Sequence, residues 1–407
     1  MSHSVTRSGT VSVARVGARL RELGPIATLL FLGGAYYVDR LMRWLAYDDE
    51  GGYLYAAWRI SLGELPYRDF LTPQLPAFLY PGALILALTG NSVLAARLAM
   101  TLLVLATTLL TYLTVRRLWG VRPALLATLL MLVQSESFWA ARFFRPEAPM
   151  LFWAALGVYL FVRAYAQRRR RQLPLLVLGE RAGGEGPPAP PNRGKGLPPK
   201  TVVSHSESRS LAALGTTEAD RAPSPHAPSP GTRGEGGGEG PPAPSARGEG
   251  LLLALSGAAM GLAMASKLFG ALPLAGIGLF LLAEFLATRD WRDTVCTGLT
   301  VGLPFVAVVA VIFGAFVALT PETLGAVLGH HLRQGQGMPV LQVVAKALGL
   351  YWDYIRHQPV YVALGLGGAI LSLRRARGVA RVYAWQLPTA LVFLLLTLFF
   401  RYHKMGI

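Results

Sequence analysis

The stretch "YDDEGGYLYAAWRISLGELPYRDF", residues 47–70, places three consecutive acidic residues, Asp48, Asp49 and Glu50, between two strongly apolar parts of the chain. Such a run has two interpretations. It is a solvated turn that caps a helix, which is the more common use of acids at this place, or it holds a catalytic base at a membrane surface. The composition and the other charged motifs of the chain bear on this choice.

The residues after the acids are typical of a short amphipathic helix. The side chains that recur at three- and four-residue spacing are Tyr53, Ala56, Ala57 and Ile60. Gly63 and Pro66 mark the end of the pattern. Because the free N–H groups at a helix start favour negative charge, the sequence predicts that Asp49 and Glu50 lie in the first turn of this helix.

The composition is that of a membrane protein. Of the 407 residues, 53% are hydrophobic and only 15% are charged, whereas soluble domains have about 25% charged residues. The net charge of +17 comes mainly from short basic clusters between apolar runs. This is the positive-inside pattern of membrane proteins, and it argues against nucleic acid as a partner. The single cysteine, Cys296, excludes an internal disulfide and a cysteine metal site.

The apolar runs predict an all-α polytopic membrane protein. Its expected spans are 23–42, 95–115, 121–137, 148–166, 251–266, 268–287, 296–319, 358–373 and 381–400. The run 76–90 has 15 residues and contains Pro81, whereas a span needs about 20 residues. We therefore expect it to lie at the membrane interface. The N-terminus and the basic clusters then lie in the cytoplasm, and both acidic motifs lie outside a plasma or inner membrane.

This pattern divides the chain into four parts. Residues 1–22 are a cytoplasmic tail, and 23–171 are a membrane module with an outer loop at 43–92. Residues 172–250 are rich in Pro and Gly and contain "GGEGPPAP" twice, which predicts a disordered cytoplasmic insertion without chemistry. Residues 251–407 are further membrane helices. The chain stops directly after an apolar run, so we expect it to be truncated there.

Further charged residues stand at helix starts and turns. Glu147 in "FFRPEAP" follows Arg145 and a proline that is typical of a helix start. Lys267 in "MASKLFG" lies in a short outer turn between two apolar runs, where a lysine is either a snorkelling anchor or a phosphate ligand. Taken alone, a helix-start acid next to an arginine is usually structural.

A polar segment, "HHLRQGQ", follows the run 296–319 in what we expect to be a long outer loop. Its candidate phosphate ligands are His330, His331 and Arg333. Two adjacent histidines do not have the spacing of a zinc site, so a plain loop is the alternative. The sequence contains no nucleotide-phosphate loop and no dinucleotide fingerprint. A nucleotide-linked substrate is therefore not expected, and a lipid-linked donor at the outer face fits better.

These motifs resemble the integral-membrane glycosyltransferases of the GT-C fold. The bacterial relatives of dolichyl-phosphate-mannose–protein mannosyltransferases and of lipid A aminoarabinose transferases are the most similar. Their first outer loop has an Asp-Glu pair, an interfacial helix, a Gly-Pro-Tyr turn, a proline-rich segment and a second interfacial helix. Asp49-Glu50, "GELPYRDF", "TPQLP" and 76–90 match in this order. "RFFRPEAPMLFW" resembles the second outer loop, with Glu147 in place of an aspartate, and "MASKLFG" resembles a Thr-Lys segment.

The resemblance implies an inverting transfer of a sugar from a polyprenyl-phosphate donor to a lipid, glycan or protein hydroxyl. Asp49 is then the base, and Glu50 and Glu147 orient the acceptor or hold a basic partner. The residues expected to contact the phosphate or the substrate are Arg68, Asp69, Arg145, Lys267, His330, His331 and Arg333. No cofactor is expected; a divalent metal on Asp49 and Glu147 is the disfavoured option. A transporter or flippase and an inactive, truncated relative are the alternatives.

Overall fold

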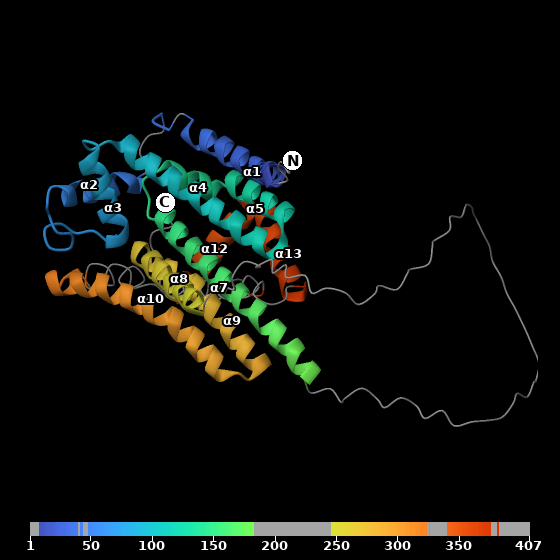
Figure 1. The fold of residues 1–407 in the computed structure, drawn as a ribbon. Helices are drawn as coiled ribbons and strands as arrows, with labels where there is room; N and C mark the ends of the chain where they lie inside the picture. The colour runs from blue at the N-terminus through green and yellow to red at the C-terminus, as the bar shows by residue number, and fades with distance from the viewer. Residues whose placement is uncertain are drawn as a thin grey trace, which may run out of the picture. The chain divides into compact units, whose positions relative to one another are not determined.

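The computed structural model describes residues 8–39, 41–43, 48–182, 246–323, 325, 340–375 and 381, and every regular element in these ranges is a helix (Figure 1). The prediction of an all-α protein is confirmed. The helices are α1 (Ser8–Val38), α2 (Asp48–Ser61), α3 (Pro76–Leu88), α4 (Val93–Trp119), α5 (Val121–Val133), α6 (Ser135–Arg142), α7 (Glu147–Ala182), α8 (Ala246–Ser266), η1 (Leu268–Ala271), α9 (Leu272–Thr288), α10 (Trp291–Leu319), α12 (Val340–His357) and α13 (Pro359–Arg375).

The long apolar runs form membrane-spanning helices. Among the described residues, five helices are long and apolar enough to cross a membrane, and a sixth span arises if α5 and α6 are counted together. These two helices meet at an angle of 62° around Gln134, so the run 121–137, expected as one helix, is broken. Long helices satisfy their backbone hydrogen bonds internally, which lipid requires. The prediction of a multi-pass membrane protein is confirmed.

The outer surface of the bundle is apolar. Only 6% of the most apolar part of α10 is buried, compared with 33–44% for the other long spans. Leu303 and Val311 of α10 are 62% and 70% exposed. Apolar side chains with this exposure are stable in contact with lipid chains.

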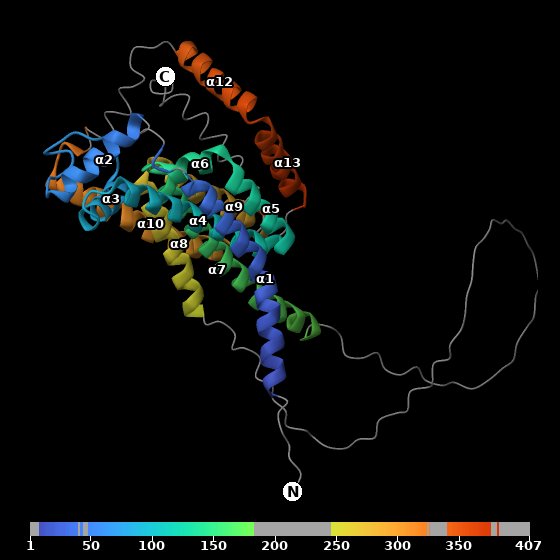
Figure 2. The same ribbon diagram turned by 90° about the horizontal axis from the view of Figure 1, so that it is seen from above.

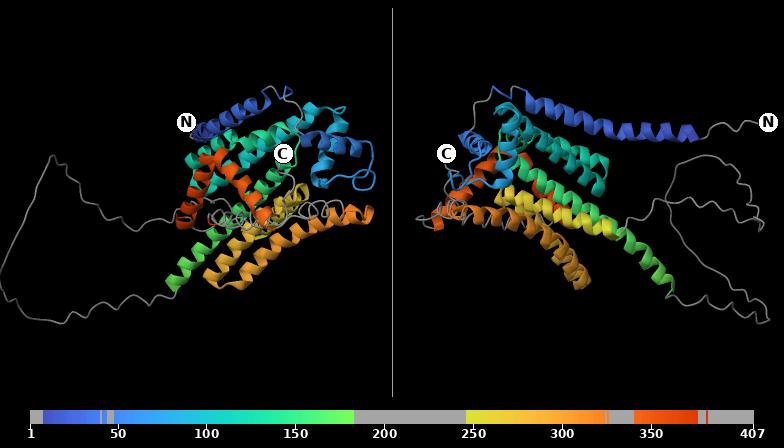
Figure 3. Two further views of the ribbon diagram at one scale, coloured as in Figure 1. Left: turned by 180° about the vertical axis from the view of Figure 1, so that it is seen from behind. Right: turned by 60° about the vertical axis from the view of Figure 1, so that its left-hand side comes forward.

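Helices α7, α8 and α10 pack closely because glycines face their neighbours (Figure 3). A Cβ atom added to Gly257 of α8 would lie 1.9 Å from the Val301 carbonyl oxygen of α10. On its other side, α8 contacts α7 through Ser256, whose hydroxyl donates to the Gly157 carbonyl at 2.8 Å. Small residues at such positions let membrane helices approach one another.

The segment between α2 and α4 leaves one end of the bundle and returns to the same end. Glu50 of α2 contacts both Arg97 of α4 and the backbone of Phe144. Residues 51–96 therefore begin and end at one level. The helix α3 within this segment has 13 residues, or about 20 Å, which is shorter than the roughly 30 Å hydrocarbon core. This is the arrangement expected for the run 76–90.

Three boundaries differ from those expected. Helix α1 begins at Ser8, so helical structure includes most of the predicted tail. Helices α7 and α8 continue to Ala182 and back to Ala246, so they include the ends of the predicted insertion. The expected outer loop after α10 contains α12, which leads directly into α13 (Figure 2). The central part of the insertion and the span 382–400 lie outside the described residues.

Candidate functional site

Asp49 lies in the first turn of α2, and its side chain is exposed. Gly51 and Gly52 follow it, and a Cβ atom added to either glycine would meet nothing within 4 Å in the part of the chain that the structure describes. The N–H groups of a first helical turn lack intrahelical acceptors and favour negative charge. The start of α2 is therefore open to a ligand beside the Asp49 carboxylate.

Glu147, the first residue of α7, binds two cations from different parts of the chain. Its Oε1 lies 2.5 Å from Lys267 Nζ and 3.2 Å from Arg145 NH2. Lys267 has an extended backbone and precedes η1, 120 positions after Glu147. The second carboxylate oxygen, Oε2, is buried and has no hydrogen-bond partner among the described residues. Two cations and one carboxylate leave a net positive charge, which favours an anionic ligand such as a phosphate.

Tyr53 connects Asp49 to this group. It lies one helical turn after Asp49, and its hydroxyl lies within electrostatic range of the Asp49 carboxylate. Burial raises the pKa of Tyr53, the charges of Asp49 and Glu147 raise it further, and Arg145 lowers it. The Tyr53 ring packs edge-on against Phe78 of α3, with 5.6 Å between the ring centroids. The Tyr53 phenol is thus within electrostatic range of all three charged groups, which makes them one candidate site.

Glu50 is completely buried, although it follows the exposed Asp49. Its Oε1 accepts hydrogen bonds from Arg97 Nε at 3.0 Å and from the Phe144 N–H at 2.9 Å. Its Oε2 accepts a hydrogen bond from Arg97 NH2 at 2.6 Å. Arg97 is 3% exposed. The structure therefore places Glu50 on a basic partner in the protein interior.

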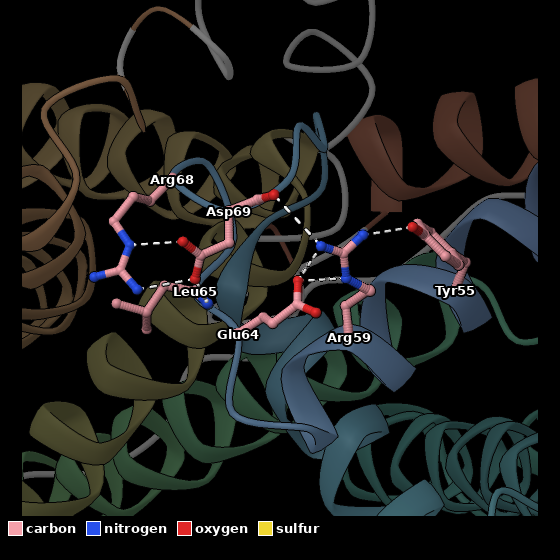
Figure 4. Close-up of polar contacts among 6 residues, drawn as sticks. All are labelled: Tyr55, Arg59, Glu64, Leu65, Arg68 and Asp69. Carbon is pink, nitrogen blue, oxygen red and sulfur yellow. Dashed lines mark hydrogen bonds and ion pairs between the residues drawn. The ribbon is translucent and has the colours of Figure 1, made fainter.

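Arg68 and Asp69 pair with each other in the loop after α2 (Figure 4). Arg68 donates from Nε and NH2 to the Asp69 carboxylate at 2.8 and 2.9 Å, and the Leu65 N–H donates to it at 2.8 Å. The Arg68 bonds, followed by the Leu65 bond, lower the pKa of Asp69 to about 2. These two residues thus stabilise the loop, and their predicted contact with substrate remains a prediction.

Two further interactions hold this loop in place. Arg59 near the end of α2 pairs with Glu64 and donates to the Tyr55 hydroxyl, as Figure 4 shows. Tyr67 is 2% exposed and packs edge-on against Phe316 of α10, with 5.9 Å between ring centroids. The loop is therefore fixed both to α2 and to the end of α10.

His330, His331 and Arg333 lie outside the described residues, so their role as phosphate ligands remains a prediction. In the ranges that the structure describes, no three His, Cys, Asp or Glu side chains are grouped as metal ligands. Metal dependence also remains a prediction. Two residues of the site, Tyr53 and Arg97, were not among the candidates from sequence. The four-residue spacing from Asp49 to Tyr53 is a signal that could have identified Tyr53.

One of the comparisons with known proteins found a match. In residues 72–183 the chain matches the family model of dolichyl-phosphate-mannose-protein mannosyltransferase. The resemblance to these glycosyltransferases is thereby confirmed for a little over a quarter of the chain. The matched segment contains Arg97, Arg145 and Glu147, whereas Asp49 and Lys267 lie outside it. No curated protein and no solved structure matches the chain. The family match indicates a membrane glycosyltransferase.

Proposed function

We propose that the protein transfers a sugar from a polyprenyl-phosphate donor to an acceptor hydroxyl at the outer face of a cell membrane. The main support is that the exposed carboxylate of Asp49 lies at the same end of the bundle as Arg145 and Lys267. The reaction requires a base for the acceptor and cations for the phosphate, and this site contains both. The acceptor is a lipid, a glycan or a protein.

In this reaction the Asp49 carboxylate accepts the proton of the acceptor hydroxyl. The acceptor oxygen forms a bond to the anomeric carbon of the sugar, and the bond from that carbon to the phosphate oxygen breaks. The acceptor oxygen attacks from the side opposite the phosphate, and the bonding electrons leave with the polyprenyl phosphate, so the configuration at the anomeric carbon is inverted. A positioned general base typically accelerates such a step by about 10²–10⁴-fold.

The leaving phosphate gains negative charge as the bond breaks. Arg145 and Lys267 both contact Glu147 and supply the compensating positive charge. Fixed cations at the site of developing charge lower the barrier because they need no rearrangement during the reaction. Such a leaving group needs cations more than it needs a general acid.

An apolar cavity of about 420 Å³ suits the polyprenyl chain. Its walls are residues of α3, α4 and the start of α7, including Phe78, Ala106 and Pro149. Phe78 also contacts Tyr53, and Pro149 lies two positions after Glu147. The cavity thus begins beside the proposed phosphate site, where the first carbons of the donor lipid would lie.

Basic side chains lie at the other end of the long helices. They are Arg116, Arg117, Arg168, Arg289 and Arg292. Basic residues favour the cytoplasmic side. We therefore assign this end and the N-terminus to the cytoplasm, and the Asp49 end to the outside.

The proposal is tested by Asp49→Asn in membranes supplied with a radiolabelled polyprenyl-phosphate sugar. Loss of the base is expected to lower the transfer rate by about 10²-fold or more. Asp353→Asn is the matched control, because Asp353 is an exposed carboxylate on α12 whose ion pair within the described residues is with His357 of the same helix. Normal transfer by the Asp49 variant would rule out the proposed base.

A further inference from the structure

The buried pair of Arg97 and Glu50 lies between the two halves of the proposed site. Glu50 directly follows the proposed base, Asp49. The N–H that Glu50 accepts belongs to Phe144, which directly precedes the phosphate-binding Arg145. Glu50 is thus adjacent in sequence to the proposed base, and its carboxylate binds the residue that is adjacent to the proposed phosphate ligand. A movement of Glu50 would change the distance between the base and the cations.

Arg97 attaches this carboxylate to a rigid helix. Its NH1 group donates to the Leu41 carbonyl at 2.7 Å, and its guanidinium lies 5.1 Å from the centre of the Phe143 ring. Nε and NH2 bind the two oxygens of Glu50. Arg97 therefore joins the chain after α1, the start of α2 and the segment before α7 to the second turn of α4. The planar guanidinium suits this task because its donors are fixed in direction.

We propose that Arg97 and Glu50 are positioning residues, whose ion pair sets the separation between the Asp49 carboxylate and the Arg145–Glu147–Lys267 group. Glu50 itself exchanges no proton with the substrate. This inference rests on the proposed function, and of the two roles expected from sequence it favours the one in which Glu50 holds a basic partner over the one in which it orients the acceptor. The complete burial of Glu50 supports this role.

Stability alone does not explain a buried ion pair at this place. Replacing such a pair by apolar residues of similar volume is often neutral or stabilising, whereas removing one partner is costly. An apolar pair, however, has no acceptor for the Phe144 N–H and no donor for the Leu41 carbonyl. The specific contribution of the ion pair is therefore the alignment of three chain segments.

Two double variants separate alignment from stability. Glu50→Leu with Arg97→Met gives an apolar pair, and Glu50→Gln with Arg97→Gln gives a neutral pair that retains an acceptor for the Phe144 N–H. The apolar pair is expected to lower kcat by about 100-fold, the effect of a misplacement of about 1 Å, with little change in the KM for the donor. The neutral pair is expected to recover most of this loss and to keep the wild-type pH dependence of kcat, because Asp49 remains the base.

Hydrogen exchange of the segment 143–147 gives a readout that needs no substrate. The apolar pair should accelerate exchange of the Phe144 amide by about tenfold or more, and the neutral pair should restore its protection. Wild-type kcat or unchanged Phe144 exchange in the apolar pair would overturn the inference. A neutral pair that restores the protection of the Phe144 amide but transfers no sugar would also overturn the inference, because the charge of Glu50 would then be needed for the chemical step.

Arg168→Met is the matched control. Arg168 also forms ion pairs within the bundle, with Glu249 and Asp293, but at the opposite end of the membrane-spanning part of α7. Its loss should lower the thermal stability while kcat and Phe144 exchange stay at the wild-type values.

If the apolar pair does not accumulate in membranes, Arg97→Lys takes its place, because it keeps the charge and loses the planar set of donors. If the wild type transfers no sugar from any polyprenyl-phosphate donor, the proposed function fails, and the exchange measurement still decides the positioning role.

Discussion

Lys267 Nζ lies 2.5 Å from Glu147 Oε1, although 120 positions separate the two residues along the chain. The contact joins the turn after α8 to the start of α7. Arg145 binds the same oxygen at 3.2 Å. The helices after the insertion therefore contribute a cation, Lys267, to a site whose carboxylates, Asp49 and Glu147, come from helices before the insertion.

Replacing Lys267 by Met should weaken donor binding. Arg145 and Glu147 would remain as a neutral pair, so the net positive charge that attracts the phosphate would be lost. We expect kcat/KM for the donor to fall by about 10²-fold, and the inhibition constant of a sugar-free polyprenyl phosphate to rise. Both quantities are measured in detergent with the purified protein.

Arg292→Met is the control for this prediction, because Arg292 is an exposed arginine at the opposite end of the bundle. It should leave both constants unchanged. Equal effects of the two substitutions would indicate a general effect of charge on the membrane protein and would exclude a phosphate site at Lys267.

The loop after α2 should loosen in acid. The pKa of Asp69 is lowered in the folded protein from 3.8 to about 2 by Arg68 and the Leu65 N–H. A lowered carboxyl pKa stabilises the folded loop above the unfolded value, and this contribution is lost as the pH falls from about 4 to about 2. Protection of the Leu65 amide from hydrogen exchange should therefore fall in this range in the wild type. In Asp69→Asn the protection should already be low at pH 5 and above, and should depend little on pH; similar profiles for both proteins would contradict the assignment.

The sequence predicted the helical spans because long apolar runs have few alternatives in a membrane. It also predicted that Asp49 and Glu147 lie at one end, since the run 76–90 is too short to cross and contains Pro81. The structure agrees, through the contacts of Glu50 with Arg97 and Phe144. The charge pattern and the length of an apolar run are local properties of the sequence, so predictions based on them need no structure.

The burial of Glu50 and the identity of its partner could not be predicted in this way. Three adjacent acids look equally solvated in sequence, yet Asp49 is exposed and Glu50 is buried, because successive residues of a helix point in different directions. The partner that makes the burial possible, Arg97, lies 47 positions away inside an apolar run. Helix α12 was missed because its segment follows a stretch rich in Gly and Gln that resembles a loop.

The insertion should be dispensable for transfer. Arg168 of α7 binds Glu249 of α8, and it also pairs with Asp293 and Thr297 of α10. The helices on both sides of residues 183–245 are therefore joined by contacts that do not involve this segment. Replacing residues 183–245 by a short Gly-Ser linker should leave the transfer rate within about twofold of the wild type, because loop length has a small effect on stability. The same deletion combined with Arg168→Met should lower the melting temperature, and a large loss of transfer from the deletion alone would show that the insertion takes part in function.

Filling the apolar cavity should affect long donors selectively. Ala106 lines the cavity between α3, α4 and α7, and a tryptophan at this position would occupy much of the space proposed for the polyprenyl chain. Each buried CH₂ group contributes about 0.8 kcal/mol, so the loss of two or three such groups raises the KM for a long-chain donor by roughly 10- to 50-fold. A donor with one or two isoprene units should be affected much less.

Leu109→Trp is the matched control, because Leu109 lies on the same helix, is 37% exposed and does not line the cavity. If Ala106→Trp raised the KM for short and long donors equally, the effect would be a distortion of the site, and the lipid chain would have to bind elsewhere.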